Sequence, residues 1–186
     1  APVQHRLQGF TGTIQTDAYE VYQALARQQP GVTRIGCLAH SRRRFYAALK
    51  EHLSEAVWFI AQIRALYQIE DAVRDQSADA RHARRQQDAP ALWAALKAKA
   101  EVLQPTVLPK STMGKAVSYF LDEYDALIGY LRDGRFEIDN NLIENDIRPT
   151  AVGRKRWLFI GHPHAGWRSA VIYSILVSLR RRGINP

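Results

Sequence analysis

The chain has 186 residues, of which 46% are hydrophobic and 24% are charged, as in ordinary globular domains. Cys37 is the single cysteine, which excludes an intrachain disulfide scaffold and favours a reducing, cytoplasmic setting. No apolar run approaches the roughly 20 residues of a membrane-spanning helix, and no signal peptide is visible. We therefore expect neither a membrane protein nor a disulfide-bonded secreted one.

The charge is distributed unevenly along the chain. The formal net charge is +8, from 26 basic and 18 acidic residues, and all of this excess lies in residues 147–186, which contain no Asp or Glu. A basic segment of this kind attracts polyanions, of which nucleic acid is the commonest. The alternative is a basic face that only keeps the protein in solution.

The first part of the chain predicts a strand, a helix and a second strand. Residues 11–17 (TGTIQTD) predict a short strand that ends on Asp17. Tyr19 and Leu25 mark a helical repeat that stops near Pro30, and residues 32–39 predict the second strand. This order is typical of part of a parallel or mixed sheet.

A helical stretch of about 90 residues follows from Ser41. Apolar residues recur there at three- and four-residue intervals, which predicts one long amphipathic helix or two. Residues 75–90 are polar and are predicted to be a loop or an exposed helix end. Pro90 is predicted to open a helix over residues 90–103.

The next helix of this stretch is predicted from its caps. Ser111 or Thr112 is predicted to cap a helix that ends at residues 133–134.

The last part of the chain predicts a return to mixed structure. Residues 136–139 predict a brief extended piece, followed by a helix that Pro149 ends. Residues 154–161 predict a strand, and residues 170–179 predict an apolar helix that closes on a run of arginines. The fold class is therefore α/β and helix-rich, with mixed parts at 1–40 and 134–186 and a helical insertion at 41–133.

Asp17 is the first candidate site residue. Ligands bind at the carboxyl ends of strands in open α/β sheets, and a carboxylate there suits a hard cation such as Mg²⁺. The alternative is an N-cap, in which Asp17 accepts the free N–H groups of the helix that follows.

A second acidic group lies in the segment IDNNLIEND, residues 138–146. Glu144 and Asp146 are two residues apart on a predicted helix, so they should not face the same site. Glu144 is the candidate metal ligand, whereas Asp139, Asn140 and Asn141 suit a helix start and Asp146 suits a surface ion pair. The alternative for the whole segment is a well-capped helix without catalysis.

A CxxH sequence, Cys37 to His40, is a weaker candidate. Zinc requires three or four ligands, and the nearest companions in the sequence are His162 and His164. The alternative is that Cys37 packs in the core and His40 makes an ordered hydrogen bond near Asp17.

The basic segment offers candidates for phosphate binding. They are Arg148, Arg154, Lys155, Arg156 and Arg168. Aromatic residues lie among them and would stack on bases or, alternatively, fill a core. These are Trp157, Phe159 and Trp167.

Four strings cover nearly the whole chain apart from the middle of the helical stretch. They are LQGFTGTIQTDAYEVYQAL, GCLAHSRRRFYAAL, YLRDGRFEIDNNLIENDIRPTAVGRKRWLFIGHPHAG and AVIYSILVSLRRRGINP. In order and spacing they resemble the transposases of the insertion-sequence-66 group.

The resemblance implies a ribonuclease-H-like core, interrupted by a helical insertion, with an Asp-Asp-Glu triad that binds Mg²⁺ or Mn²⁺. Asp17 matches the second Asp of the triad and Glu144 matches the Glu, with Cys37, His40, Asp139 and Asn140 as supporting residues. It also implies a bacterial cytoplasmic protein that acts as a homo-oligomer on insertion-sequence ends and target DNA. The first Asp has no match, since residues 1–16 contain no acid. A basic RKR at 154–156 stands where the family more often reads RKN.

The resemblance therefore predicts the C-terminal part of a DNA transposase. The whole protein would cleave and transfer DNA strands, whereas this chain alone is expected to be inactive because its triad is incomplete. The alternative is a non-catalytic module for DNA binding or assembly.

Overall fold

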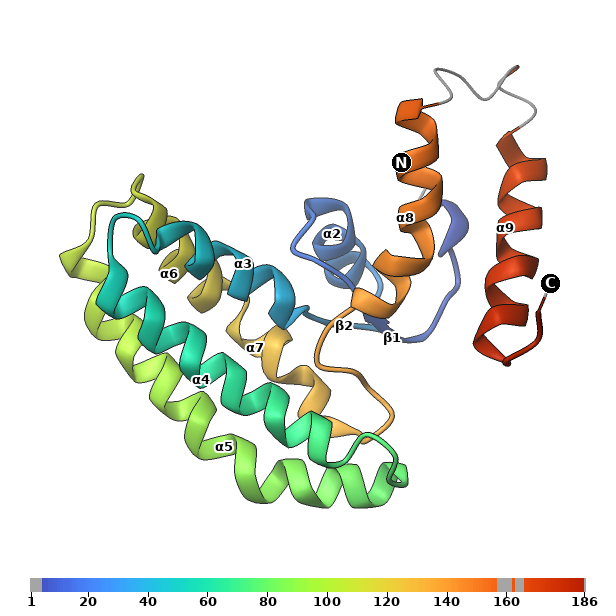
Figure 1. Ribbon diagram of the computed structural model, residues 1–186. Helices are drawn as coiled ribbons and strands as arrows, with labels where there is room; N and C mark the ends of the chain where they lie inside the picture. The colour runs from blue at the N-terminus through green and yellow to red at the C-terminus, as the bar shows by residue number, and fades with distance from the viewer. Residues whose placement is uncertain (1–4, 157–161, 163–165, 186) are drawn as a thin grey trace. The chain divides into compact units, whose positions relative to one another are not determined.

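The computed structural model describes residues 5–156, 162 and 166–185, except for the side chains of residues 154 and 155. It is helix-rich, with one parallel pair of strands (Figure 1). Two compact units follow each other along the chain, residues 1–140 and residues 141–186. Among the described helices, none combines the length and apolar character that crossing a membrane would require.

The parallel pair forms the start of the first unit. Strand β1 (Gly12–Gln15) is followed by helix α2 (Glu20–Gln28) and strand β2 (Val32–Ile35), and the two strands pair from Gly12 opposite Val32 to Gln15 opposite Ile35. The predicted strand–helix–strand order is confirmed. Strand β2 is shorter than predicted because the Gly36 N–H donates to the Ala126 carbonyl at 2.7 Å and the chain has entered a helix by Leu38.

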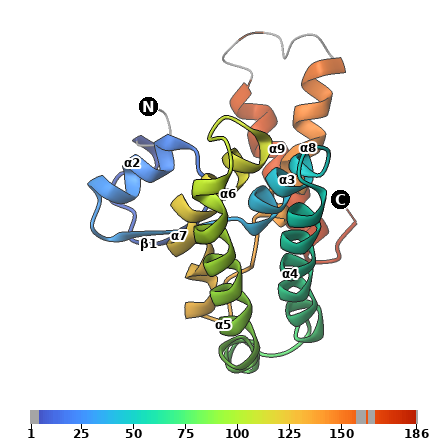
Figure 2. The same cartoon turned by 90° about the vertical axis from the view of Figure 1, so that its left-hand side faces the viewer.

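Three long helices continue the first unit. They are α3 (Leu38–Ala48), α4 (Leu53–Ala72) and α5 (Ala78–Leu103), and α4 and α5 lie side by side (Figures 1 and 2). Of the two alternatives for residues 75–90, the loop is wrong and the exposed helix end is confirmed, since α5 begins at Ala78, where the Ser77 hydroxyl accepts the Ala80 N–H at 3.3 Å.

Pro90 lies inside α5 and does not open a new helix. Proline lacks one helical N–H donor and normally disturbs the turn before it. Here the side chains on both sides of it, Ala89 and Trp93, are buried in the core. Burial of this helix face stabilises a continuous helix more than the missing hydrogen bond costs.

Shorter helices complete the first unit. They are η1 (Gln104–Thr106), α6 (Thr112–Asp122), α7 (Tyr124–Leu127) and η2 (Ile128–Arg132). The predicted Ser111 cap is confirmed, because the Ser111 hydroxyl accepts the Gly114 N–H at 3.0 Å. The single helix predicted up to residue 133 is instead divided at Glu123 into α6, the short α-helix α7 and the tighter 3-10 helix η2. Residues 136–140 contain no strand.

Aromatic side chains form the centre of the core in the helical part of this unit. Phe45 stacks on Phe59 with ring centroids 4.2 Å apart, and Trp93 stacks on Phe120 at 6.2 Å. All four side chains are buried. Burying each contributes roughly 1.5–3 kcal/mol relative to exposure, so this cluster holds α3, α4, α5 and α6 together.

The second unit contains α8 (Asn141–Arg156) and α9 (Gly166–Arg181). The prediction that Pro149 ends α8 is wrong, since the helix continues through it to Arg156. Residues 154–156 are therefore helical and not the start of a strand, whereas residues 157–161 lie outside the described residues.

The apolar helix predicted over residues 170–179 is confirmed as part of α9. Gly183 ends it with a φ of 71°. The Gly183 N–H donates to the Arg180 carbonyl and the Ile184 N–H to the Leu179 carbonyl, both at 3.0 Å. This is the Schellman pattern, which glycine favours because it has no Cβ.

Candidate metal and nucleic-acid site

Asp17 lies just beyond the carboxyl end of β1. The Thr16 N–H donates to the Ile35 carbonyl at 3.1 Å, so the strand pairing continues to the residue before Asp17. The half-buried Asp17 accepts the Tyr19 N–H on Oδ1 at 3.1 Å. Asp17 therefore supports the turn into α2, as the capping alternative foresaw, although the N-cap residue itself is Tyr19.

Arg34 places a positive charge beside this turn. Its Nη1 donates to the Asp17 carbonyl oxygen at 3.4 Å, and its Nη2 lies 2.7 Å from Glu123 Oε2. Gln23 of α2 donates to the other carboxylate oxygen of Glu123 at 2.9 Å. Arg34 is thus neutralised by Glu123, while it touches Asp17 only through the backbone.

Cys37 follows the carboxyl end of β2 and is buried, with 1% of its surface exposed. Burial raises the pKa of its thiol, which disfavours the thiolate that binds zinc or acts as a nucleophile. The predicted packing of Cys37 in the interior is confirmed. His40 lies in the first turn of α3, where its backbone N–H donates to the Cys37 carbonyl at 3.2 Å.

The predicted supporting residues Asp139 and Asn140 lie beside Cys37. The Asn140 N–H donates to Cys37 Sγ at 3.5 Å. Asp139 Oδ2 accepts a hydrogen bond of 2.6 Å from the Tyr67 hydroxyl of α4. Sequence reasoning missed this role of Tyr67, since its place in the repeat of α4 indicated only packing.

Glu144 belongs to the second unit and lies in the first turn of α8, where it is half-buried. A carboxylate there is stabilised by the positive end of the helix dipole. The prediction that Asp146 makes a surface ion pair is confirmed, because it pairs with Arg181 of α9.

The described phosphate-binding candidates are solvent-accessible cations of the second unit. Arg148 and Arg156 are exposed on α8, and Arg168 is exposed on α9 with its guanidinium 5.7 Å from the Trp167 ring centroid. Arg154 and Lys155 lie on α8, but their side chains are outside the described residues, as are Trp157, Phe159 and His164.

The first unit adds a basic helix that sequence reasoning passed over. Helix α3 contains no Asp or Glu and exposes Arg42, Arg43 and Arg44. The Arg44 guanidinium lies 4.0 Å from the ring centroid of Tyr119, whose pKa is raised to about 12 chiefly by burial. The run SRRR was a visible signal, since consecutive cations without acids mark candidate anion-binding surfaces.

The described residues contain no cluster of three or more His, Cys, Asp or Glu side chains that could hold a metal ion. Asp17 and Glu144 are the carboxylates of the predicted site, and each belongs to a different unit. Both have the oxygen ligands that Mg²⁺ and Mn²⁺ prefer. A zinc site of Cys37, His40, His162 and His164 stays a prediction, and the protonated thiol makes it less favourable.

Comparison with known proteins identifies relatives along the whole chain. The model of the family described as "Transposase IS66 family" matches residues 1–168. The uncharacterized protein y4jD of Sinorhizobium fredii (strain NBRC 101917 / NGR234) is 33% identical over 189 residues, which cover 98% of this chain and 37% of that protein. The uncharacterized protein y4qI of the same organism is 35% identical over 191 residues, which cover 99% of this chain and 35% of that protein.

The chain thus spans little more than a third of the length of these relatives. No solved structure matches it significantly. The family match covers most of the chain and includes both Asp17 and Glu144. On this match, the chain belongs to the IS66 family of transposases.

Proposed function

We propose that the chain is part of the catalytic core of a DNA transposase, in which Asp17 and Glu144 are two of the three acidic metal ligands. The observation that carries this proposal is the place of Asp17, directly beyond the carboxyl end of β1 in a chain of a transposase family. Functional groups gather at this end of parallel strands.

The proposed core is ribonuclease-H-like and is interrupted by a helical insertion. The support is the succession of β1, α2 and β2, followed by helices from Leu38 to Arg132 before the segment that leads to α8. The two parallel strands, joined by α2, form the part of the core that would bear Asp17.

The proposed cofactor is Mg²⁺ or Mn²⁺. A bound divalent cation supplies an activated nucleophile and stabilises the leaving oxygen in phosphoryl transfer. Asp17 and Glu144 would hold it through carboxylate oxygens, and the Tyr19 N–H would keep the Asp17 carboxylate oriented. Because residues 1–16 contain no acid, the first Asp of the triad has no counterpart in this sequence, and we expect no robust DNA cleavage by this chain alone.

The proposed substrate is the DNA of insertion-sequence ends and target, bound by a homo-oligomer of the whole protein. Arg148, Arg156 and Arg168 are exposed and suited to phosphate contact, and Arg154 and Lys155 lie on the same helix as the first two. Arginine donates to phosphate oxygens in a bidentate geometry and keeps its charge at every relevant pH.

Iron-directed cleavage tests the metal ligands without requiring catalysis. Fe²⁺ with ascorbate and peroxide cuts the backbone close to its binding site. We expect cuts near residues 17 and 144 that excess Mg²⁺ suppresses and that Asp17→Asn or Glu144→Gln abolishes. Asp75→Asn, which changes an exposed acid after α4, is the control. Cuts that persist unchanged in Asp17→Asn would show that Asp17 is no metal ligand.

A cleavage assay tests the incomplete triad. With Mn²⁺ and supercoiled plasmid, the chain is expected to show no robust nicking. Robust turnover that disappears in Asp17→Ala would contradict the expectation that this chain lacks an essential acid.

A non-catalytic DNA-binding module is the second candidate, favoured by the exposed cations of α3, α8 and α9. It predicts DNA affinity that depends on salt but not on Asp17, Glu144 or divalent metal. Under either function, replacing Arg154, Lys155 and Arg156 by Gln should lower the salt slope by about 0.9 for each lost phosphate contact.

A matched control removes three cations that already have acidic partners. These are Arg27 beside Glu20, Arg74 beside Asp71 and Lys97 beside Glu101. The control variant lowers the net charge by the same amount. An equal loss of DNA affinity in both variants would mean that residues 154–156 contribute only through the net charge of the protein and make no specific phosphate contacts.

A further inference from the structure

The segment that leads into α8 is irregular, yet every one of its residues is held by hydrogen bonds. We call residues 136–140 the strap. An irregular segment must find partners for its backbone N–H and C=O groups outside regular structure. Apart from the Phe136 N–H, which donates to the Asp133 carbonyl of the preceding turn at 3.2 Å, the partners of the strap come from several separate elements of the first unit.

Helix α5 holds the beginning of the strap. Arg85 donates from Nη2 to the Phe136 carbonyl at 2.9 Å, and Arg81 donates to both carboxylate oxygens of Glu137 at 3.1 Å. The Arg85 side chain is completely buried and is also paired with Glu70 of α4. The strap therefore begins on a fixed point of the helical core.

The strand ends hold the middle of the strap. Gln15, the last residue of β1, donates from Nε2 to the Glu137 carbonyl at 2.6 Å and to the Gly36 carbonyl at 3.2 Å. The Leu38 N–H, at the start of α3, donates to the Ile138 carbonyl at 3.1 Å, and the Ile138 side chain is buried. The strap thus runs past the carboxyl ends of both strands.

Tyr67 of α4 holds the end of the strap. Its hydroxyl donates to Asp139 Oδ2 at 2.6 Å, and the next residue, Asn140, donates its N–H to Cys37 Sγ at 3.5 Å. Burial and the carboxylate raise the pKa of the Tyr67 phenol, so it stays a proton donor at any physiological pH. A hydrogen bond to a charged acceptor is stronger than one between neutral groups.

We propose that Tyr67 is a positioning residue, which latches the strap through Asp139 and thereby fixes the point at which α8 and its Glu144 begin. Helix α8 starts at Asn141, directly after the strap. The part of this inference that concerns Glu144 rests on the proposed metal site. The latch itself depends only on contacts within the first unit.

Cys37 supplies an intrinsic probe of the latch. It is the single cysteine and is buried beneath the strap, which contacts it through Asn140. Tyr67→Phe removes only the donor and leaves the ring in place. We expect it to raise the rate at which Cys37 reacts with a small disulfide reagent about tenfold, since a charge-assisted hydrogen bond is lost.

Two variants control the measurement. Tyr124→Phe removes the hydroxyl of another partly buried tyrosine of the same unit and should leave the rate unchanged. Asp139→Ala should raise the rate as Tyr67→Phe does, and the double variant should add little, because both changes break the same bond.

Hydrogen exchange separates a latch from general destabilisation. In Tyr67→Phe, we expect loss of protection in peptides covering residues 136–144 and none in peptides from α5 and α6. Equal loss throughout the core would mean that Tyr67 acts only on stability. An unchanged Cys37 rate would overturn the latch as well.

Iron-directed cleavage then tests the consequence for Glu144. Tyr67→Phe should weaken the cuts near residue 144 more than those near residue 17. If the unmodified chain gives no cuts at all, the proposed metal site fails while the Cys37 rate still decides the latch. If the cuts near residue 144 are the same in both proteins, Tyr67 does not position Glu144.

Discussion

Replacing Arg85 by Met is the sharpest test of what holds the first unit together. Arg85 is completely buried, and its Nε and Nη2 donate to the two carboxylate oxygens of Glu70 at 2.9 and 2.5 Å. The same guanidinium donates to the carbonyls of Tyr130, Asp133 and Phe136 at 3.4, 3.0 and 2.9 Å. One side chain therefore joins α4, α5, η2 and the strap.

The expected loss follows from these contacts. Removing one member of a buried ion pair costs about 3–5 kcal/mol, because the other charge stays buried without a partner. Arg81 lies 3.7 Å from Glu70 Oε2 and would still partly neutralise the Glu70 carboxylate in the variant. The three carbonyls that accept from Arg85 would lose their donor. We expect Arg85→Met to lower the free energy of unfolding by about 4 kcal/mol, which moves the urea midpoint by about 2 M.

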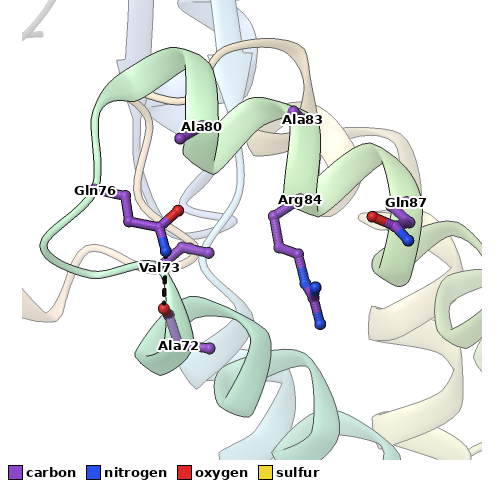
Figure 3. A pocket seen from close by; sticks show the side chains of 7 residues that line it. All are labelled: Ala72, Val73, Gln76, Ala80, Ala83, Arg84 and Gln87. Atoms are coloured by element: carbon purple, nitrogen blue, oxygen red, sulfur yellow. Dashed lines mark hydrogen bonds between the residues drawn. The ribbon is translucent and has the colours of Figure 1, made fainter.

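The neighbouring arginine is the matched control. Figure 3 shows Arg84 at a groove between the end of α4 and the start of α5, lined also by Val73 and Gln76. Arg84 pairs at 2.5 Å with Asp88, and half of its side chain is exposed. Exposed pairs contribute about 0–1 kcal/mol, so Arg84→Met should hardly move the midpoint.

Urea unfolding followed by far-ultraviolet circular dichroism measures both variants. The double variant Glu70→Met with Arg85→Met should be more stable than Arg85→Met alone, because it removes the unpaired buried carboxylate. Our reasoning would be refuted if Arg84→Met and Arg85→Met shifted the midpoint equally. A double variant as unstable as the sum of the two single changes would also refute it.

Three further predictions concern local structure. Gly134→Ala should cost about 1–3 kcal/mol in urea unfolding, because a Cβ there would lie 1.7 Å from the first carbonyl oxygen of α5, whereas Gly166→Ala meets nothing within 4 Å. Ser111→Ala should cost about 1 kcal/mol through loss of the α6 cap, measured in the same way. Hydrogen bonds from Arg135 lower the pKa of Asp133 from 3.8 to about 2. The stabilisation by this exposed pair is therefore present above pH 4 and lost as the pH falls towards 2, and Arg135→Ala should raise the Asp133 pKa in a carboxylate NMR titration.

Local sequence signals predicted the elements whose causes are local. The cap at Ser111 and the helix that ends near Gly183 each depend on residues within one or two turns, and the strand before Asp17 pairs with residues only 20 positions further along the chain. The same kind of signal failed at Pro90 and Pro149, where each proline lies inside a helix. In α5 the reason is tertiary, since the buried face of the helix continues on both sides of Pro90.

The candidate site was predictable only in part, because some of its contacts are local in the sequence and others join residues far apart in the chain. Asp17 could be placed at a strand end because the strand is short and locally encoded. The partners of Asp139 and Phe136 could not be predicted, because Tyr67 and Arg85 are 72 and 51 residues away in the chain. From the sequence alone, Arg85 would be assigned to the surface, because it lies in a polar stretch and arginine is seldom buried without a partner. Its ion pair with Glu70 explains why it is buried.

These separations also say how the strap comes to be ordered. The hydrogen bonds that join Gln15 and Cys37 to the strap close loops of 122 and 103 residues. Closing such long loops costs chain entropy, so these bonds are expected to form after the local structure between their ends. The α4–α5 hairpin is local and carries Tyr67, Arg81 and Arg85. It can therefore form first and then receive the strap, so the helical stretch does more than separate Asp17 from Glu144 in the sequence. The Arg85 side chain does not hydrogen-bond to Cys37, but it holds the beginning of the strap that covers Cys37. We therefore expect Arg85→Met to make the Cys37 thiol more reactive, as Tyr67→Phe does.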